Sequence, residues 1–280
     1  RPRMPRPGPA STPCYPLVSM DQRPIGMFDS GVGGLSVLRE LRGMAPHERI
    51  IYFADTAYFP YGPRPASEVR TRSFAAGHRL LRSDVKLIVV ACNTASAAAL
   101  PDLREAVDLP FVGMVPGVKP AALRSRSGRV VILATEGTFD GELYARVVDE
   151  FARGTTVTAV TGTGLAALVE AGKAGTARAR ETLERLLGPQ VKAGADTVVL
   201  GCTHYHFLAA DIAALFPGVE IVDTSEAVAR RAAQLLEEAD ARAEPGRSGV
   251  LNLIVTGDRD AFAAAMQRLG FEHTVMEATR

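Results

Sequence analysis

Two similar stretches of sequence decide the fold: Leu87-Ile-Val-Val-Ala-Cys92-Asn93-Thr94 and Thr197-Val-Val-Leu-Gly-Cys202-Thr203-His204. Each is a short apolar run rich in β-branched residues, followed by a small residue, a cysteine and polar residues. Such runs are typical of strands buried in a parallel sheet. Open α/β sheets bind ligands at the carboxyl ends of their strands. The repeat therefore predicts that Cys92 and Cys202 face one binding site.

The bulk composition excludes several classes of protein. The chain has 280 residues, with 32 Lys and Arg against 31 Asp and Glu and a formal net charge of +1. This balance gives no reason to expect a nucleic-acid or membrane partner. The apolar runs are far shorter than the ~20 residues that a membrane-spanning helix needs. The three cysteines are too few for a disulfide framework and favour a reducing, cytoplasmic location.

The first 22 residues differ from the rest because they are rich in Pro and Arg. They lack the apolar core of a secretory signal. We expect residues 1–22 to form a disordered N-terminal extension, with Met20 as a possible alternative start and no chemical role for Cys14.

From Pro24 onward, strand-like and helix-like patterns alternate, and the same rhythm restarts near residue 129. This predicts a duplicated α/β unit, each with a parallel sheet covered on both faces. The expected strands are 25–28, 49–53, 85–90, 111–115, 129–133, 156–160, 197–200, 219–222 and 251–256. The expected helices are 35–41, 67–81, 94–107 with a break near Pro101, 141–151, 165–171, 177–191, 209–215, 226–239 and 259–269.

Two loops are expected beside the cysteines. Asp29-Ser30-Gly31-Val32-Gly33-Gly34 lies between a strand and a helix, where backbone amides suit an anion such as a ligand carboxylate. It matches neither the dinucleotide-binding nor the Walker A pattern. A structural interpretation is a tight turn in which Asp29 or Ser30 caps the helix. Pro60-Tyr61-Gly62-Pro63 follows the second strand and forms either a simple turn or a wall of the same pocket.

The paired cysteines suggest proton transfer. Each is expected at a helix N-terminus, which favours the thiolate, and a modest drop from the usual pKa of about 8.5 gives a base near neutral pH. Two thiols on opposite sides of a carbon could remove a proton from one face and return one to the other. Asp29 and His204 could adjust the protonation of these thiols.

Other uses of the cysteines fit less well. One buried cysteine at a strand end is usually a small apolar residue. A zinc site, with His204 and His206 nearby, is disfavoured because the chain lacks the close cysteine pairs that are common in structural zinc sites. A cysteine hydrolase leaves the second thiol without a role. The lysines, Lys86, Lys119, Lys173 and Lys192, lie in no context that suggests a pyridoxal-phosphate site. We therefore predict no cofactor and no metal.

Four motifs, taken in order, resemble the glutamate racemases of the cofactor-independent aspartate/glutamate racemase superfamily. They are Phe28-Asp29-Ser30-Gly31-Val32-Gly33-Gly34-Leu35, Asp55-Thr56 through Pro60-Tyr61-Gly62-Pro63-Arg64, Ala91-Cys92-Asn93-Thr94-Ala95 and Gly201-Cys202-Thr203-His204-Tyr205. The resemblance covers nearly all of the chain from Pro24. Aspartate racemases typically carry glutamate where this chain has His204, so that residue favours glutamate as the substrate.

The resemblance implies an isomerase with a two-base mechanism. Cys202 would take the α-proton of L-glutamate and Cys92 that of D-glutamate, with Asp29 assisting Cys92, His204 assisting Cys202 and Glu170 supporting His204. The implied substrate-binding positions are Asp29, Ser30, Pro60, Tyr61, Gly62, Asn93, Thr94, Thr135, Thr138, Thr203 and His204.

The resemblance also implies two pseudo-symmetric, doubly wound parallel-sheet domains with the active site between them. The first comprises residues 23–116 and 225–280, and the second residues 117–224. A cytoplasmic homodimer supplying D-glutamate for peptidoglycan, and thus for cell-wall biogenesis and cell shape, is expected.

The chain departs from the family pattern at His206-Phe207, where Pro-Leu usually follows the tyrosine, and at Thr161-Gly162-Thr163-Gly164, where a Cys-Pro pair is common. The alternatives are a racemase of aspartate or a hydantoin in the same superfamily, and a binding or regulatory protein that inhibits DNA gyrase.

Overall fold

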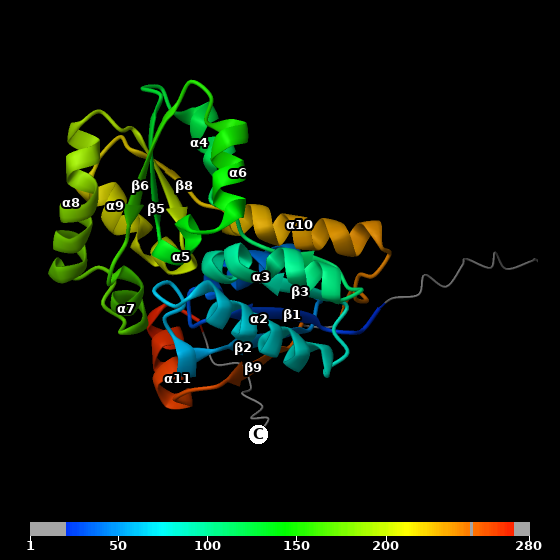
Figure 1. Ribbon diagram of the computed structural model, residues 1–280. Coiled ribbons are helices and arrows are strands. Elements are labelled where there is room, and N and C mark those ends of the chain that lie inside the picture. Colours follow the sequence, from blue (N-terminus) through cyan, green and yellow to red (C-terminus); the bar gives the residue numbers. More distant parts are fainter. Residues whose placement is uncertain (1–20, 247–248, 272–280) are drawn as a thin grey trace, which may run out of the picture.

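Two parallel β-sheets form the scaffold of the computed structural model, which describes residues 21–246 and 249–271 (Figure 1). The first sheet has the order β4-β3-β1-β2-β9 and the second the order β6-β5-β7-β8. All strand pairs are parallel. The strands are β1 Ile25–Asp29, β2 Ile50–Ala54, β3 Leu87–Val90, β4 Phe111–Val112, β5 Arg129–Ala134, β6 Thr156–Thr161, β7 Thr197–Gly201, β8 Glu220–Val222 and β9 Leu251–Val255. The predicted α/β fold class is confirmed.

Helices cover both faces of each sheet, as the almost uninterrupted burial of the central strands requires. On the first sheet, α1 Leu35–Met44, α10 Ser225–Glu238 and α11 Arg259–Arg268 pack on one face, and α2 Ala66–Leu81 and α3 Asn93–Ala106 on the other. On the second sheet, α4 Val118–Arg124 and α6 Glu142–Phe151 face α7 Leu165–Glu170, α8 Ala177–Lys192 and α9 Ala209–Leu215 across the strands. Figure 1 shows the two helix-covered sheets one above the other.

The two sheets repeat one topology around their cysteines. In the first, β2 and β3 lie on opposite sides of β1, so the winding reverses between β1 and β3. In the second, β6 and β7 lie on opposite sides of β5 in the same way. Ligands bind at such switch points because the connections leave in opposite directions and open a crevice. Cys92 follows β3 and Cys202 follows β7, so both cysteines stand at equivalent switch points.

The chain crosses between the sheets twice. It leaves the first sheet between β4 and α4, and returns between β8 and α10. The two crossovers run side by side, since a Cβ at Gly117 would lie 2.9 Å from Val222 Cγ1 and 3.2 Å from Thr224 Cγ2. The predicted boundaries at 116/117 and 224/225 fall in these crossovers. Strand β9 pairs with β2, so the C-terminal part of the described chain completes the first sheet.

Several local expectations are wrong. Helix α3 runs unbroken through Pro101, although proline cannot donate the bond to the carbonyl of Ala97. The strand expected at 111–115 is only the two residues of β4. Helix α4 and the short α5, Glu136–Phe139, were not predicted. Cys202 leads into a 3-10 helix, η2 Thr203–Leu208, rather than into an α-helix.

The predicted N-terminal extension lies almost wholly outside the described residues, and Cys14 and Met20 lie there too. Asp21 is described, and its carbonyl accepts a hydrogen bond of 2.7 Å from Lys86 Nζ. No helix in the described chain is long and apolar enough to cross a membrane.

Candidate active site

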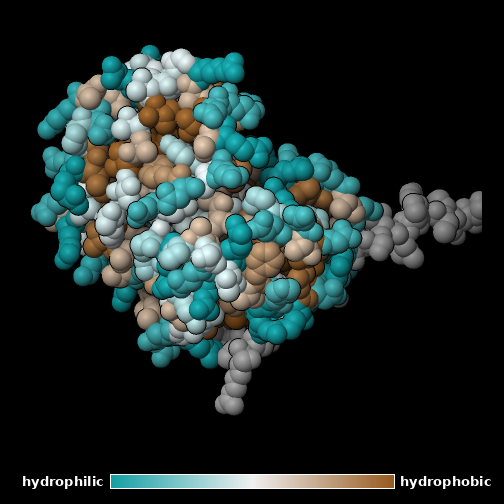
Figure 2. Space-filling view, viewed as in Figure 1, coloured by the Kyte–Doolittle hydropathy of each residue, from teal (hydrophilic) through white to brown (hydrophobic). Residues whose placement is uncertain are grey.

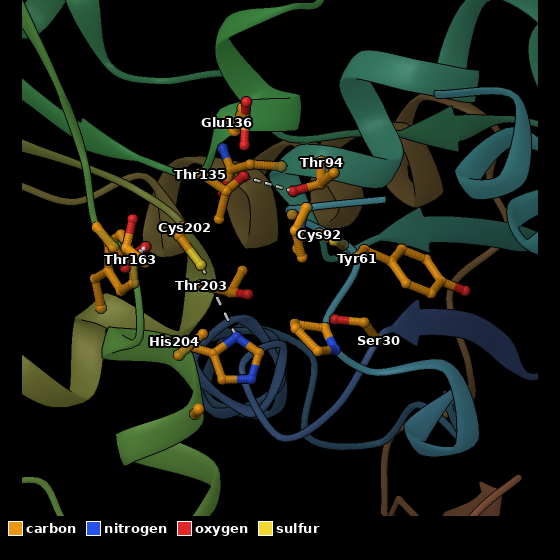
Figure 3. Close-up of a pocket in the computed structure, with 18 of the residues that line it drawn as sticks. Ser30, Tyr61, Cys92, Thr94, Thr135, Glu136, Thr163, Cys202, Thr203 and His204 are labelled. Atoms are coloured by element: carbon orange, nitrogen blue, oxygen red, sulfur yellow. Dashed lines mark hydrogen bonds between the residues drawn. The ribbon is translucent and has the colours of Figure 1, made fainter. Parts of the chain in front are cut away.

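A cavity of about 170 Å³ lies between the carboxyl ends of the two sheets. Residues from both sheets form its wall (Figure 3). They are Ser30, Phe59, Pro60, Tyr61, Gly62, Pro63, Cys92, Asn93, Thr94, Thr135, Glu136, Thr161, Gly162, Thr163, Gly164, Ala166, Ala167, Cys202, Thr203, His204 and Tyr205. Most of the site residues predicted from the sequence are therefore brought together here.

Cys92 and Cys202 approach the cavity from different sheets, and Figure 3 shows the two side chains on opposing walls. Both thiols are free and buried, with exposed fractions of 5% and 7%. A small ligand held between them would have one sulfur on each side. The sequence prediction of two thiols at one site agrees with this placement.

The surroundings of Cys92 favour its neutral thiol. Its Sγ caps α3 by accepting a hydrogen bond of 3.5 Å from the amide of Ala95. Burial, followed by the negative charge of Asp29, raises the pKa of Cys92 well above its ordinary value, and the Ala95 amide offsets this only in part. The expectation that the helix N-terminus makes Cys92 a ready thiolate is therefore wrong, because desolvation outweighs the helix dipole.

Asp29 lies behind Cys92, fully buried, rather than in the cavity wall. Its carboxylate accepts hydrogen bonds from the amides of Ser30 at 2.6 Å and Gly34 at 2.5 Å, and from Thr203 Oγ1 at 3.3 Å. Burial raises the pKa of Asp29, although His204 and the two amides oppose the shift. A buried carboxylate beside a thiol can accept its proton or return one.

Cys202 has a different partner. Its Sγ lies 3.9 Å from His204 Nδ1, and His204 Nε2 lies 2.8 Å from Glu170 Oε1. Burial acts to lower the pKa of His204, but the contacts with Cys202 and Glu170 outweigh it and raise this pKa well above its usual value. Cys202 thus has its own proton-exchanging partner, His204, in place of a carboxylate. The two cysteines therefore stand in chemically unequal surroundings.

The glycine-rich loop after β1 does not present its amides to the cavity as expected. The amides of Ser30 and Gly34 bind Asp29, and the amide of Val32 donates a 2.7 Å bond to Glu170 Oε1. The anions that this loop binds are thus two of the protein's own carboxylates. No Asp29 or Ser30 side chain serves as the N-cap of α1, where Gly34 stands without a side-chain cap.

Glycine is required in this loop because side chains from the second sheet come within contact of its backbone. A Cβ at Gly31 would lie 1.8 Å from Glu170 Oε1. A Cβ at Gly33 would lie 2.4 Å from both His204 Nδ1 and Thr203 Oγ1. A side chain at Gly31 would displace the Glu170 carboxylate, and one at Gly33 would displace His204 and Thr203.

Polar groups without charge line the rest of the cavity. Asn93 is only 2% exposed, and neither its Oδ1 nor its Nδ2 has a hydrogen-bond partner among the described residues. Leaving both unpaired is costly unless a ligand binds them. Nearby, Thr94 Oγ1 lies 2.8 Å from Thr135 Oγ1, which lies 2.9 Å from Thr138 Oγ1. This hydroxyl chain joins α3 of the first sheet to α5 of the second.

Three other residues predicted for the site do not simply present their polar groups to the cavity. Thr138 and Glu170, like Asp29, lie behind the cavity wall and reach it through Thr135 and His204. The Tyr61 hydroxyl points away from the cavity and donates a 2.6 Å bond to Asp55 (Figure 3). A ligand contact by Tyr61 would therefore use its backbone or ring.

Sequence reasoning missed part of the wall. Phe59 packs on the His204 ring, with 5.3 Å between the ring centroids. Glu136 is the one carboxylate among the lining side chains, and Tyr205 and residues 161–164 complete the second-sheet wall. Residues 161–164 and Tyr205 stand in or beside the departures from the family pattern, a signal that could have placed them here.

Within the described residues, no group of three or more His, Cys, Asp or Glu side chains could hold a metal ion. The groups that surround the cavity suit acid–base chemistry, because two thiols, each with its own ionisable partner, lie among neutral hydrogen-bonding groups. Such an arrangement defines a class of enzymes that move a proton at one carbon.

The comparisons with known proteins agree with that class. The family model described as Asp/Glu/Hydantoin racemase matches residues 35–232. The glutamate racemase of Herpetosiphon aurantiacus is 45% identical over 256 residues, which are 90% of this chain and all of the relative. The chain therefore belongs to the glutamate racemases of this family.

Solved structures give the same result. The glutamate racemase of Thermus thermophilus, in complex with β-chloro-D-alanine, is 38% identical with a TM-score of 0.80, over 93% of this chain and 98% of that one. The Escherichia coli glutamate racemase, in complex with L-glutamate and the activator UDP-MurNAc-ala, is 36% identical with a TM-score of 0.79, over 91% and 98% of the two chains.

Proposed function

We propose that this enzyme interconverts L- and D-glutamate by two-base proton transfer between Cys202 and Cys92, with no cofactor. The observation that carries the proposal is the unequal pairing of the two thiols across one cavity. Cys202 lies beside His204, and Cys92 lies beside buried Asp29.

This pairing matches one direction of the reaction. The buried surroundings of Cys92 favour its thiol, which can donate a proton, while His204 lies beside Cys202 and can hold the proton that Cys202 gives up. Cys202 then removes the α-proton of L-glutamate as Cys92 protonates the opposite face. For D-glutamate the roles reverse, which requires Cys92 to pass its proton to Asp29 and Cys202 to take one from His204 before the reaction starts. Direct transfer between aligned groups is effective because the reacting carbon is held between them.

The cavity must also stabilise the carbanion that forms at Cα. The buried amide of Asn93 and the hydroxyls of Ser30, Thr94 and Thr203 supply neutral hydrogen bonds for the substrate's carboxylates and ammonium. Exclusion of water strengthens these bonds as charge shifts onto the α-carboxylate. The L-glutamate complex of the Escherichia coli relative supports glutamate as the substrate.

A racemisation assay tests the proposal. Purified protein without added cofactor is incubated with L-glutamate or D-glutamate, and circular dichroism follows the approach to the racemic mixture. We expect racemisation from either enantiomer, little with aspartate, and loss of activity in both Cys92→Ser and Cys202→Ser. No racemisation of glutamate, or a variant with most of its activity left, would sink the two-base proposal.

The same proposal extends to the cell. D-Glutamate is a building block of peptidoglycan, so we propose that the enzyme supplies it for the cell wall from the cytoplasm, as a homodimer. Complementation of a D-glutamate auxotroph tests the first point and light scattering of the purified protein tests the last.

A further inference from the structure

A groove rich in positive charge opens beside the catalytic cavity. It lies between α7 and α8 and encloses about 380 Å³. Its charged lining side chains are Lys173, Arg178 and Arg185, and no acidic side chain of the described chain lines it. We call this feature the basic groove.

The three cations of the basic groove are exposed and lack ion-pair partners among the described residues. Their neighbour Arg180 differs, since its Nε lies 2.8 Å from Asp211 Oδ1. Figure 2 shows a hydrophilic surface along the α8 side of the molecule. In a chain with a net charge of only +1, an unneutralised cluster of this kind produces a local positive potential.

The basic groove and the catalytic cavity share a wall. Thr163, Gly164 and Ala167 line both. A Cβ at Gly164 would meet nothing within 4 Å, so the shared wall has open space beside it at that point. It also contains part of the Thr161–Gly164 segment, to which the reaction itself assigns no role.

The cavity itself offers little attraction to an anion from a distance. Its charged lining side chains are His204 and the carboxylate of Glu136. Asp29 and Glu170 lie directly behind the wall. Glutamate carries a net negative charge near neutral pH, so these carboxylates oppose its approach.

We propose that the basic groove is an electrostatic vestibule that attracts glutamate toward the cavity across the Thr163–Ala167 wall. The inference rests on the proposed racemase function. The three exposed cations place a positive field beside the shared wall, while the neutral groups of the cavity bind the substrate in position. A positive field in a cleft raises the local concentration of an anionic ligand and is weakened by salt.

The test removes the three charges and keeps the hydrogen-bonding capacity. A Lys173→Gln/Arg178→Gln/Arg185→Gln variant is compared with wild type for L- and D-glutamate at low ionic strength and again near 0.5 M KCl. We expect KM to rise at least ~3-fold at low ionic strength with kcat unchanged, and the difference to vanish at high salt. Arg146→Gln, on α6 and exposed, is the matched control and should leave KM at the wild-type value.

An unchanged KM at low ionic strength would overturn the vestibule. A raised KM that persists at high salt would also overturn it, because loss of packing rather than of charge would then be the cause. In both results the wild-type enzyme still racemises glutamate, whereas failure of the proposed function would leave wild type itself inactive.

Discussion

Glu170 Oε1 lies 2.8 Å from His204 Nε2 and accepts a 2.7 Å hydrogen bond from the amide of Val32. One oxygen thus joins the glycine loop of the first sheet to the histidine of the second. The same contact helps to raise the pKa of His204, the side chain that lies beside Cys202. Domain contact and acid–base chemistry are therefore coupled at one carboxylate.

Removal of the negative charge of Glu170 should shift the pH profile of the reaction. His204 is useful as an imidazolium, so kcat/KM should fall as pH rises through its raised pKa. Glu170→Gln removes a cause of the increase in this pKa, so the fall in kcat/KM should begin at lower pH. The measurement is kcat/KM against pH, with Glu184→Gln on α8 as control. An alkaline limb at the wild-type position in Glu170→Gln would contradict this role.

The same linkage predicts a pH-dependent stability. A histidine whose folded pKa is raised stabilises the native state fully below its unfolded value of about 6.5, and this contribution is lost as pH rises through the folded pKa. The stability deficit of Glu170→Gln should therefore be larger at pH 6 than at alkaline pH. Urea unfolding at both pH values measures it.

Asn93 should show a conflict between function and stability. Its amide has no protein partner in the described chain, so Asn93→Leu removes two buried unsatisfied groups and should leave the empty enzyme as stable or more stable. The same change should lower kcat/KM for glutamate by roughly 10²-fold, because the substrate loses those bonds. Urea unfolding and steady-state kinetics give the two results. A large loss of stability would mean that Asn93 serves the fold instead.

The hydroxyl chain should control substrate affinity. Thr135→Val breaks both the Thr94 and the Thr138 contacts, whereas the backbone bond from Gly137 N to Gly62 O remains. We expect KM to rise about 10-fold with a smaller change in kcat. Thr138→Val removes only the end of the chain behind the wall and should have a weaker effect. Equal effects of the two substitutions would show that the chain acts through packing alone.

A buried ion pair far from the cavity should matter for stability only. Lys86 Nζ lies 2.6 Å from Glu48 Oε2 and donates to the carbonyls of Asp21 and Ala241 at 2.7 Å each. Lys86→Met leaves the Glu48 carboxylate buried without its cation and should cost about 3–5 kcal/mol of unfolding free energy. Lys86→Met/Glu48→Leu should recover part of this loss, and the activity of the folded fraction should not change. A single-variant cost below about 1 kcal/mol would show that water reaches the pair.

The main features of this fold could be predicted from the sequence because they depend on local patterns. Apolar runs located the strands before Cys92 and Cys202, and the similar alternation of strands and helices in the two halves indicated the duplication. The break predicted at Pro101 is wrong because the packing of α3 outweighs the local tendency of proline to end a helix. The short α4 and α5 carry too few periodic residues for a pattern to be seen.

The residues of the site could be predicted from the sequence, whereas their pKa values and hydrogen-bond partners could not. The thiols, Asp29 and His204 could be read from motifs, and the family resemblance supplied Glu170. The raised pKa of Cys92 depends on burial and on the position of Asp29, which no local pattern contains. The glycine loop was expected to bind a ligand anion, whereas Gly31 and Gly33 are there to admit Glu170, Thr203 and His204 from the second sheet.

The placement of deuterium during the first turnovers in D₂O tests the central claim most directly. The central claim is that two different bases serve the two faces of Cα, one for each enantiomer. L-Glutamate is converted in D₂O to a small extent, and the α-deuterium content of product and of recovered substrate is measured by mass spectrometry after chiral separation. The same measurement starts again from D-glutamate. We predict that, in both directions, the product carries solvent deuterium while the recovered substrate keeps its hydrogen. Equal deuterium in product and recovered substrate from the earliest times would mean that one base serves both faces, and would contradict the account.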